Sequence, residues 1–378
     1  FHLSSKNERG YIDQLDFKVN GRKTEIEIDK KNIDIAKLKL GRSLLPGQSV
    51  KISTSFHVKI PKTFSRFGHV DQEYQICQWY PKPAVYDSKG WHPMPYRDQG
   101  EFYAEFGSYE VNIDIPANYI VGATGILQNK EEMAWVQRLS DETHQFLEEG
   151  IKHSSEFSER KGRKTLKYTQ GNIHDFAWFA SQDYRVVSEK ATLESGKEVT
   201  AWALFKHKDI DSWRHCAKYV ADALVSFSKW LGDYPYDHCT AVQGPLLAGG
   251  GMEYPMITII GEDILESRML DEVIAHEVGH NWFQGILASN ERDFPWMDEG
   301  LNSFYELRYM KDKYGSGLDL PDGLKKVFGI GIGLQELAYQ MQVNKGKDQP
   351  IGLHSHDFSP ANYGVMVYMT TPLMLNGL

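Results

Sequence analysis

The segment His276-Glu277-Val278-Gly279-His280 has residue types and a spacing that suit metal chemistry. Residues four positions apart lie on the same face of an α-helix, so His276 and His280 can bind one ion. Glu277 lies beside His276 on the helix and points past the ion, where a base for a water molecule would stand. The pattern predicts a zinc site on a helix with a catalytic carboxylate next to it.

Glu299 is the candidate for a third ligand, because a catalytic zinc ion needs three protein ligands and one open position. Eighteen residues separate it from His280. The alternative interpretation is that these groups are ordinary buried polar side chains with protein partners. The apolar neighbours Ile274 and Trp282 indicate a buried helix, on which two histidines and a glutamate would be costly without a partner such as zinc.

This string resembles the gluzincin signature HExxH-x18-E, and the chain resembles the M1 family of zinc aminopeptidases. The segment Gly250-Gly251-Met252-Glu253-Tyr254 is similar to the family's GxMEN exopeptidase motif. The resemblance implies that these residues form the substrate-binding loop and that Glu253 binds the free α-amine of a peptide. A carboxylate is a suitable partner for an ammonium group. The chain departs from the motif at Tyr254, where the family has asparagine.

Two further matches to the family are looser. Tyr363 and Tyr368 resemble a segment whose second tyrosine stabilises the transition-state oxyanion, although Met369 and Thr370 replace the usual Lys-Gly. Tyr363 would then help Tyr368 or form a wall of the pocket, and ordinary packing of both tyrosines is the alternative. Gln78 falls where the family places a polar residue that helps to bind the substrate's amino end. A glutamine on a surface strand is the competing interpretation.

The composition fits an enzyme of this kind and excludes several other classes. A chain of 378 residues can hold two or three domains, and 41% hydrophobic with 25% charged residues is typical of soluble globular proteins. The net charge of −9 and the lack of a basic block argue against nucleic acid as a partner. No apolar run reaches transmembrane length.

The cysteines and the chain ends leave the location of the protein open. Cys77, Cys216 and Cys239 are widely spaced and are expected to be buried thiols. The compartment therefore stays open between the cytoplasm and an exported or periplasmic location, and so does the oligomeric state. The stretch 365–378 is apolar and stops without a polar tail. Family members normally continue into a helical C-terminal domain, so we expect the catalytic domain to be truncated and that domain to be absent.

The pattern of the chain changes once along its length. Residues 1–186 hold short alternating runs, such as 51–60, 109–115 and 163–169, which predict an N-terminal antiparallel β-domain. The polar stretch 141–160 is interpreted as a loop or short helix. From about residue 209 the spacing is helical, with strands expected at 240–244 and 256–260 before the helices that carry the zinc ligands. The prediction is a multidomain α+β protein whose residues 187–378 form a thermolysin-like α+β zinc peptidase domain.

These observations predict a zinc-dependent aminopeptidase that removes N-terminal residues from peptides and holds one zinc ion. Glu277 is expected to be the base, Tyr368 the oxyanion partner and Glu253 the amine partner. Another gluzincin hydrolase, either an endopeptidase or an epoxide hydrolase, is one alternative, and Glu253 argues against the endopeptidase. A catalytically silent peptide-binding protein on the same fold is the other, and the intact set of ligands and base argues against it.

Overall fold

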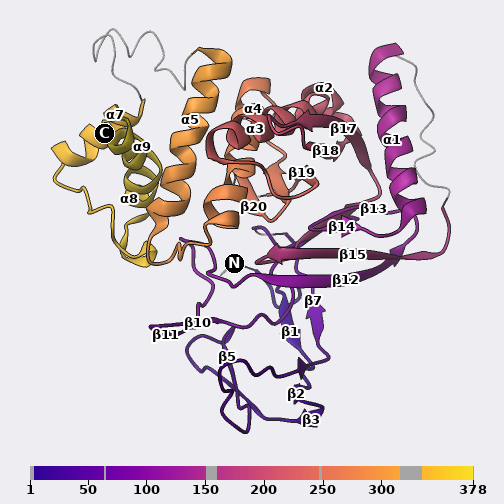
Figure 1. Ribbon diagram of the computed structural model, residues 1–378, viewed down its shortest axis with the longest axis vertical. Coiled ribbons are helices and arrows are strands. Elements are labelled where there is room, and N and C mark those ends of the chain that lie inside the picture. Colours follow the sequence, from indigo (N-terminus) through magenta and orange to yellow (C-terminus); the bar gives the residue numbers. More distant parts are fainter. Residues whose placement is uncertain (1–3, 64, 150–159, 247–248, 316–333, 378) are drawn as a thin grey trace.

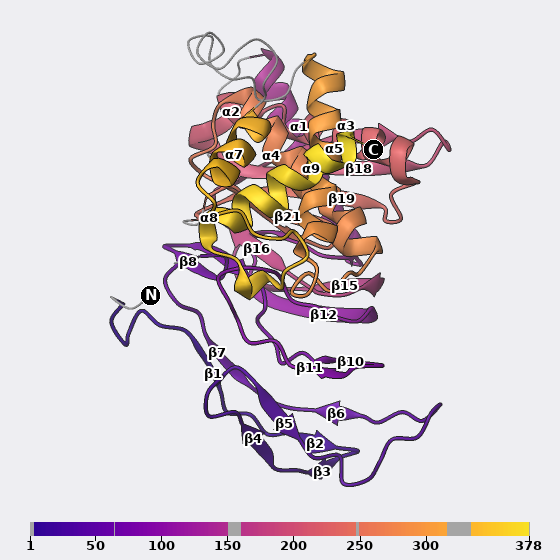
Figure 2. The same cartoon turned by 90° about the vertical axis from the view of Figure 1, so that its left-hand side faces the viewer.

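The computed structural model describes residues 4–377 except 64, 150–159, 247–248 and 316–333 (Figure 1). Short strands from the N-terminal part form one end of the molecule, and helices cover the other end. The long strands β12 and β15 run between the two. The view in Figure 2 shows the same order, with β1 to β7 at the lower end and the helices above.

The N-terminal end consists of small antiparallel sheets, in which β1 pairs with β7, β2 lies between β3 and β6, β4 pairs with β5, and β10 pairs with β11. The expected run 51–60 is divided into two short strands rather than one. Few of the side chains in this end are buried. The bounds are β1 Tyr11–Asp13, β2 Lys18–Val19, β3 Arg22–Lys23, β4 Ile26–Ile28, β5 Ala36–Leu38, β6 Ile52–Ser53, β7 His57–Lys59, β10 Val85–Asp87 and β11 Gly90–His92.

Longer strands build the middle of the molecule. β12 and β15 are antiparallel over almost their whole length, with β14 on the other side of β15. A second sheet has the order β13-β16-β9-β8. The expected antiparallel β-region is therefore present. The bounds are β8 Gly68–Val70, β9 Glu73–Ile76, β12 Gly107–Pro116, β13 Ile120–Ala123, β14 Ile126–Leu127, β15 Arg163–Ile173 and β16 Trp178–Ser181.

The helix α1 corrects one expectation. It spans Lys130–Glu149, so residues 141–149 of the stretch expected to be a loop or short helix belong to a 20-residue helix. Residues 150–159 lie outside the described part of the chain. Leu139 is buried in one core cluster and Leu147 packs against another, so an apolar face is present among many charged residues. The helix forms because these few apolar residues recur at helical spacing and dock on two cores.

A five-stranded mixed sheet forms the framework of the C-terminal half, with the order β17-β18-β19-β21-β20. β18, β19 and β21 are parallel, and the edge strands β17 and β20 are antiparallel to their neighbours. The N-terminal β-rich region and this sheet with its helices confirm the expected fold class. Residue 186 lies inside β17, whose first residue is Tyr184. The bounds are β17 Tyr184–Thr192, β18 Glu198–Lys206, β19 His238–Gly244, β20 Gly251–Tyr254 and β21 Ile257–Gly261.

Helices pack on this sheet and extend the molecule on the side drawn in orange and yellow in Figure 1. The largest core lies where α3 and α4 meet the sheet. Three π-helical segments occur in the described residues: Asn281–Ile286, Trp296–Gly300 and Tyr363–Thr370. The helix bounds are α2 Ile210–Trp213, α3 Cys216–Leu231, α4 Ser267–His280, α5 Leu301–Tyr314, α7 Leu334–Asn344, α8 Pro360–Asn362 and α9 Thr371–Asn376.

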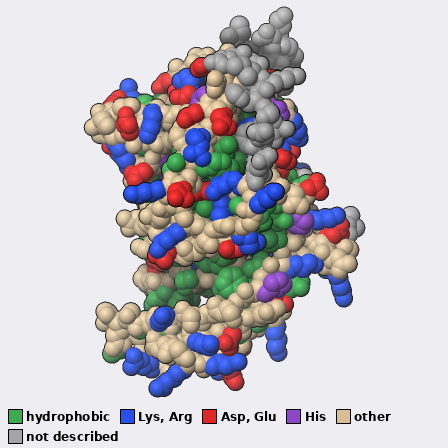
Figure 3. Space-filling view, turned by 90° about the vertical axis from the view of Figure 1, so that its right-hand side faces the viewer, with side chains coloured by type: hydrophobic (Ala, Val, Ile, Leu, Met, Phe, Trp, Pro, Cys, Tyr) green, Lys and Arg blue, Asp and Glu red, His purple; other side chains and the backbone are tan. Residues whose placement is uncertain are grey.

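The three cysteines are buried and free, as expected. Burial raises the pKa of Cys77 and of Cys239 to about 12, so neither thiol is reactive near neutral pH. Within the described residues, no helix has both the length and the apolar character needed to cross a membrane. On the face in Figure 3, basic and acidic side chains are mixed rather than separated.

Candidate metal centre and active site

The helix α4 begins with a side-chain cap and ends at the site. The carboxylate of Glu266 accepts hydrogen bonds from the backbone N–H groups of Arg268 and Met269, which satisfies the first turn. Leu270, Ile274 and other apolar residues bury one face of the helix in the main core. This packing fixes the rotation of α4 about its own axis, and therefore the direction in which its histidines point.

His276, His280 and Glu299 come together as expected. The two Nε2 atoms lie 3.2 Å apart, and Oε2 of Glu299 lies 3.2 Å from Nε2 of His276 and 3.3 Å from Nε2 of His280. Glu299 belongs to the π-helical segment Trp296–Gly300, which leads directly into α5. The three ligand atoms therefore form a nearly equilateral triangle, and the two elements that supply them are close in the sequence.

These distances fit a zinc ion. Ligand atoms about 2.0–2.1 Å from a tetrahedral zinc ion lie about 3.3 Å from one another, which is the separation seen here. Glu253, His280 and Asp298 form a second group of potential ligands. Asp298, however, lies 2.6 Å from Nδ1 of His280, on the far side of the ring from the atom that faces His276. The first group is therefore the one that suits the ion.

Two carboxylates that the sequence analysis missed hold the histidine rings. Nδ1 of His276 donates to Glu306 at 2.7 Å, and Nδ1 of His280 donates to Asp298 at 2.6 Å. Such carboxylate partners orient a ligating imidazole and make it a stronger ligand. A signal for Glu306 was present in the sequence, because it lies seven residues, about two helical turns, beyond Glu299. Asp298 had none beyond its position next to a ligand.

Charge at the site favours a cation. Burial alone would lower the pKa of His276, but hydrogen bonds to Glu299 and Glu306 outweigh burial and raise it to about 10. Burial would raise the pKa of Glu299, but His280 and His276 hold it well below its ordinary value. The carboxylates around the two histidines thus stabilise positive charge at this point, which a metal ion would also supply.

Glu277 lies beside the ligands and is not one of the three. Its side chain is 5% exposed, and its Oε2 atom has no hydrogen-bond partner among the described residues. Burial raises the pKa of Glu277 to about 7. Gly251 of β20 makes room for it, since a Cβ atom at this position would lie 2.5 Å from Oε1 of Glu277. The glycine assigned to the substrate loop therefore has a steric reason to be there.

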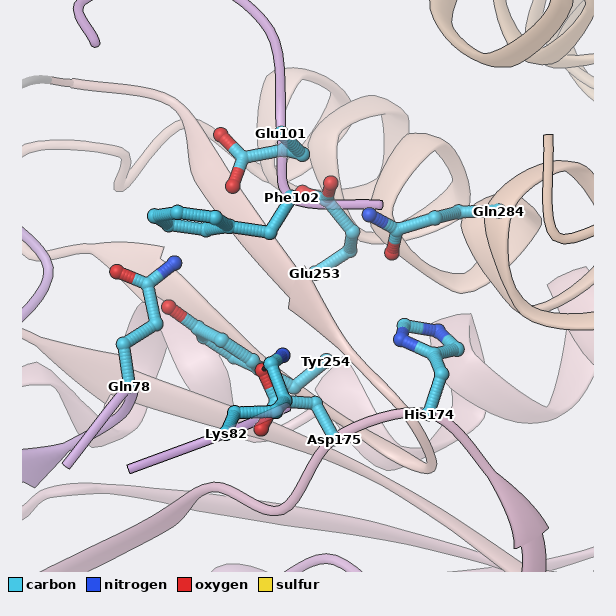
Figure 4. Close-up of a pocket in the computed structure, with 9 residues that line it drawn as sticks. All are labelled: Gln78, Lys82, Glu101, Phe102, His174, Asp175, Glu253, Tyr254 and Gln284. Atoms are coloured by element: carbon cyan, nitrogen blue, oxygen red, sulfur yellow. Dashed lines mark hydrogen bonds and ion pairs between the residues drawn. The ribbon is translucent and has the colours of Figure 1, made fainter. Parts of the chain in front are cut away.

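Glu253 lines a small pocket between the β-rich half and the helices (Figure 4). Its side chain is 7% exposed, and Oε1 has no hydrogen-bond partner in the described part of the chain. Burial raises the pKa of Glu253 well above its ordinary value. The lining residues are Gln78, Lys82, Glu101, Phe102, His174, Asp175, Glu253, Tyr254 and Gln284.

Gln78 does not lie on a surface strand, which was the competing interpretation of this residue. It follows β9 with a backbone φ of 52° and lines the pocket with Glu253. Tyr254, which replaces the motif asparagine, also lines it. Met252 packs against the core cluster that contains Tyr254, and Gly250 has a φ of 68°, a conformation that favours glycine. The five motif residues therefore include both pocket and supporting positions.

Glu101 and Phe102 form a pocket wall that no sequence pattern indicated. They lie in the connection between β11 and β12 of the β-rich half. Glu101 forms an ion pair with Arg66, and its backbone carbonyl accepts from Nε of Arg292 at 3.2 Å. Opposite them, Lys82 pairs with Asp175 at 2.9 Å. Glu101, Lys82 and Asp175 are thus paired with opposite charges, whereas Oε1 of Glu253 has no such partner among the described residues.

Tyr368 and Tyr363 reach the site from the π-helical segment Tyr363–Thr370. The hydroxyl of Tyr368 donates to Oε1 of Glu299 at 2.5 Å, and its ring stacks on His276 with centroids 6.1 Å apart. The hydroxyl of Tyr363 donates to Glu291 at 3.0 Å. The structure therefore brings Tyr368 to the ligand group and places Tyr363 beside it rather than at the ligands.

Known proteins resemble this chain in sequence over part of its length and in fold over most of it. In sequence, the chain is similar to mouse aminopeptidase Q, with 31% identity over 127 residues, which is 30% of this chain. It is also similar to Xenopus laevis leukotriene A-4 hydrolase, with 26% identity over 132 residues, which is 35% of this chain. The matches cover only 22% and 20% of those relatives. An M1 zinc metallopeptidase from Deinococcus radiodurans has the same fold, with a TM-score of 0.58, 14% identity and coverage of 97% of this chain and 72% of that one.

A second solved structure, that of Legionella pneumophila aminopeptidase A in complex with aspartic acid, has a TM-score of 0.53 at 12% identity. It covers 83% of this chain and 35% of that one. Residues 220–347, which contain the three proposed ligands, match the model of the peptidase family M1 domain. These findings confirm the resemblance of this chain to the M1 family.

Proposed function

We propose that this chain is a zinc-dependent aminopeptidase that releases the first residue of peptides with a free N-terminus. The observation that carries the proposal is the position of Glu253. Its unpaired carboxylate lies in the pocket, and one of its oxygens lies within 4.8 Å of a ring nitrogen of His280. A substrate amine held there would place the first peptide bond near the metal centre.

His276, His280 and Glu299 are the proposed ligands, with Asp298 and Glu306 behind the histidines. A zinc ion at this point would act as a Lewis acid and lower the pKa of a water molecule toward neutrality. Glu277 is the proposed base, because it is buried beside the ligands and keeps one oxygen without a protein partner. It would take a proton as water attacks the scissile carbonyl and return it to the leaving amine.

Glu253 and Gln78 are the proposed amine partners. An ammonium group would satisfy the buried carboxylate of Glu253 through a charge-assisted hydrogen bond. A peptide segment without a terminal charge would leave that carboxylate unpaired, at a cost in free energy. This difference supports exopeptidase rather than endopeptidase activity, and peptides with a free N-terminus are the proposed partners.

Tyr368 is the proposed donor to the oxyanion. Its hydroxyl lies at the carboxylate of Glu299, next to the place where a carbonyl oxygen would gain charge. We propose that two regions contribute different groups to the site. The β-rich region before β17 supplies Gln78, Glu101 and Phe102 to the pocket wall, and the region from β17 onward supplies the metal and catalytic groups.

A direct test combines metal analysis with a set of short peptides. The purified protein should contain one zinc ion per chain and should release only the first residue of peptides with a free amine. N-acetylated versions of the same peptides should be poor substrates, and a chelator should remove activity that added zinc restores. Equal cleavage of acetylated and free peptides, or internal cleavage, would show that the assignment of Glu253 is wrong.

A further inference from the structure

Two tyrosines of the segment Tyr363–Thr370 attach it in the same way to residues 291–299, which include the proposed ligand Glu299. Tyr368 donates to Glu299 at 2.5 Å, and Tyr363 donates to Oε1 of Glu291 at 3.0 Å. The two rings pack edge to face with centroids 5.9 Å apart. Residues five apart in a π-helical turn lie on the same side of it, so both hydroxyls face residues 291–299. Each tyrosine thus has its own carboxylate.

Glu291 has no part in the proposed reaction, yet it is almost completely buried. Its side chain is 2% exposed, and Oε2 has no hydrogen-bond partner among the described residues. Burial and the nearby carboxylates Asp298 and Glu299 raise its pKa well above the ordinary value. A buried carboxyl group with one unpaired oxygen lowers the stability of the fold. Stability therefore does not explain why Glu291 is buried beside Tyr363.

We propose that Glu291 is a positioning residue for the reaction. By holding Tyr363, it fixes the segment that carries Tyr368 and keeps the Tyr368 hydroxyl beside the ligand group. This inference rests on the proposed function, in which Tyr368 stabilises the oxyanion. The segment is also held by apolar packing, since Met366 and Val367 are buried in a small cluster with Phe358 and Tyr363. Apolar packing resists separation better than rotation, so a directed hydrogen bond at Tyr363 supplies the missing restraint.

Four variants test this role: Glu291→Leu, Glu291→Gln, Tyr363→Phe and the double variant Glu291→Leu/Tyr363→Phe. The zinc content and KM of the Leu and Phe variants should stay within about twofold of the parent protein, while kcat falls about 10- to 100-fold through loss of orientation. Glu291→Gln should keep most of kcat, because its amide oxygen can still accept from Tyr363. The double variant should be no slower than the slower single variant, since both remove the same contact.

Hydrogen exchange provides a readout that does not depend on activity. Amides of residues 363–370 should exchange faster in Glu291→Leu and Tyr363→Phe than in the parent protein and in Glu291→Gln. Should Glu291→Leu fail to fold, Tyr363→Phe alone carries both measurements.

The outcomes separate this inference from the proposed function. Unchanged kcat in an active Tyr363→Phe variant, multiplicative losses in the double variant, or unchanged exchange of the segment would each overturn the role of Glu291 and leave the aminopeptidase intact. A zinc-loaded parent protein that cleaves no peptide would overturn the proposed function. In that case faster exchange in the variants would still establish that Glu291 positions the segment.

Discussion

The region with the proposed metal ligands and the pocket wall meet at one site but are built in different ways. The three proposed ligands, the base and both histidine partners lie within Ser267–His280, Trp296–Gly300 and Leu301–Tyr314, which are close in sequence. The wall comes from Gln78 and Glu101–Phe102, in connections between strands of the β-rich half. Helical geometry therefore places the proposed metal ligands and base, whereas contacts between distant segments place the side chains of the pocket wall.

If the region with the proposed metal ligands carries the chemistry, the largest loss should follow removal of its base. Glu277→Gln should retain zinc and fold normally, because residue 277 is not a ligand, while kcat falls about 10²- to 10⁴-fold for lack of a proton acceptor. Steady-state kinetics on a metal-quantified sample would check this. Turnover near that of the parent protein in the zinc-loaded variant would remove Glu277 from the mechanism.

A change at Gly251 should damage the same base indirectly. In Gly251→Ala the new Cβ would meet Oε1 of Glu277 at 2.5 Å, so the carboxylate has to move. A displacement of this kind can cost about 10² in kcat, with zinc retained. Gly352→Ala is the matched control, since no atom lies within 4 Å of the Cβ position there. Equal kcat in the two variants would mean that Glu277 tolerates the methyl group.

The carboxylates behind the histidines should affect metal affinity rather than the chemical step. Asp298→Ala should weaken zinc binding about 10- to 100-fold, because His280 loses the partner that orients its ring. Competition with a chromophoric chelator would measure the change, and saturating zinc should restore much of the activity. In Asp298→Asn the amide oxygen can still accept from Nδ1, so a loss as large as that of Asp298→Ala would point to charge rather than orientation.

The pocket wall should influence binding of the free amine. Glu253→Ala removes a charge-assisted contact of about 1.5–3 kcal/mol, which raises KM for peptides with a free amine about 10- to 100-fold. The penalty for N-acetylated peptides should shrink in the same variant. A comparison of kcat/KM for matched free and acetylated peptides provides the measurement, and an unchanged ratio would contradict amine capture.

The smallest effect is expected at Gln78, which sharpens the contrast with the base. Gln78→Gly removes the side chain and suits the backbone φ of 52°, so the fold should not be strained. Loss of one neutral hydrogen bond of about 0.5–1.5 kcal/mol should raise KM about 2- to 10-fold and leave kcat unchanged. A fall in kcat as large as that of Glu277→Gln would mean that the two regions are not separable.

The helix α1 shows how polar sequence can hide structure. The sequence of 141–160 is acidic and polar, which favours a loop or short helix. The helix has few buried apolar residues, but Leu139 and Leu147 pack on two different core clusters. This packing depends on sheets that are distant in the sequence. The strand pattern was more reliable for β12, in which more exposed and less exposed residues alternate, because this alternation is set within the strand itself.

The sequence by itself was enough to predict the proposed ligand group His276, His280 and Glu299 and a carboxylate in the loop that resembles the exopeptidase motif. Helical periodicity is local, so a spacing of four residues is enough to place two histidines on one face. Only the tertiary structure decided which carboxylates hold the histidine rings, that Gln78 and Phe102 line the pocket, and that Glu291 meets Tyr363. Those contacts join segments up to about 190 residues apart, as in the bond from Arg292 to Glu101. No local pattern encodes them, because their geometry arises only when the β-rich half packs against the helices.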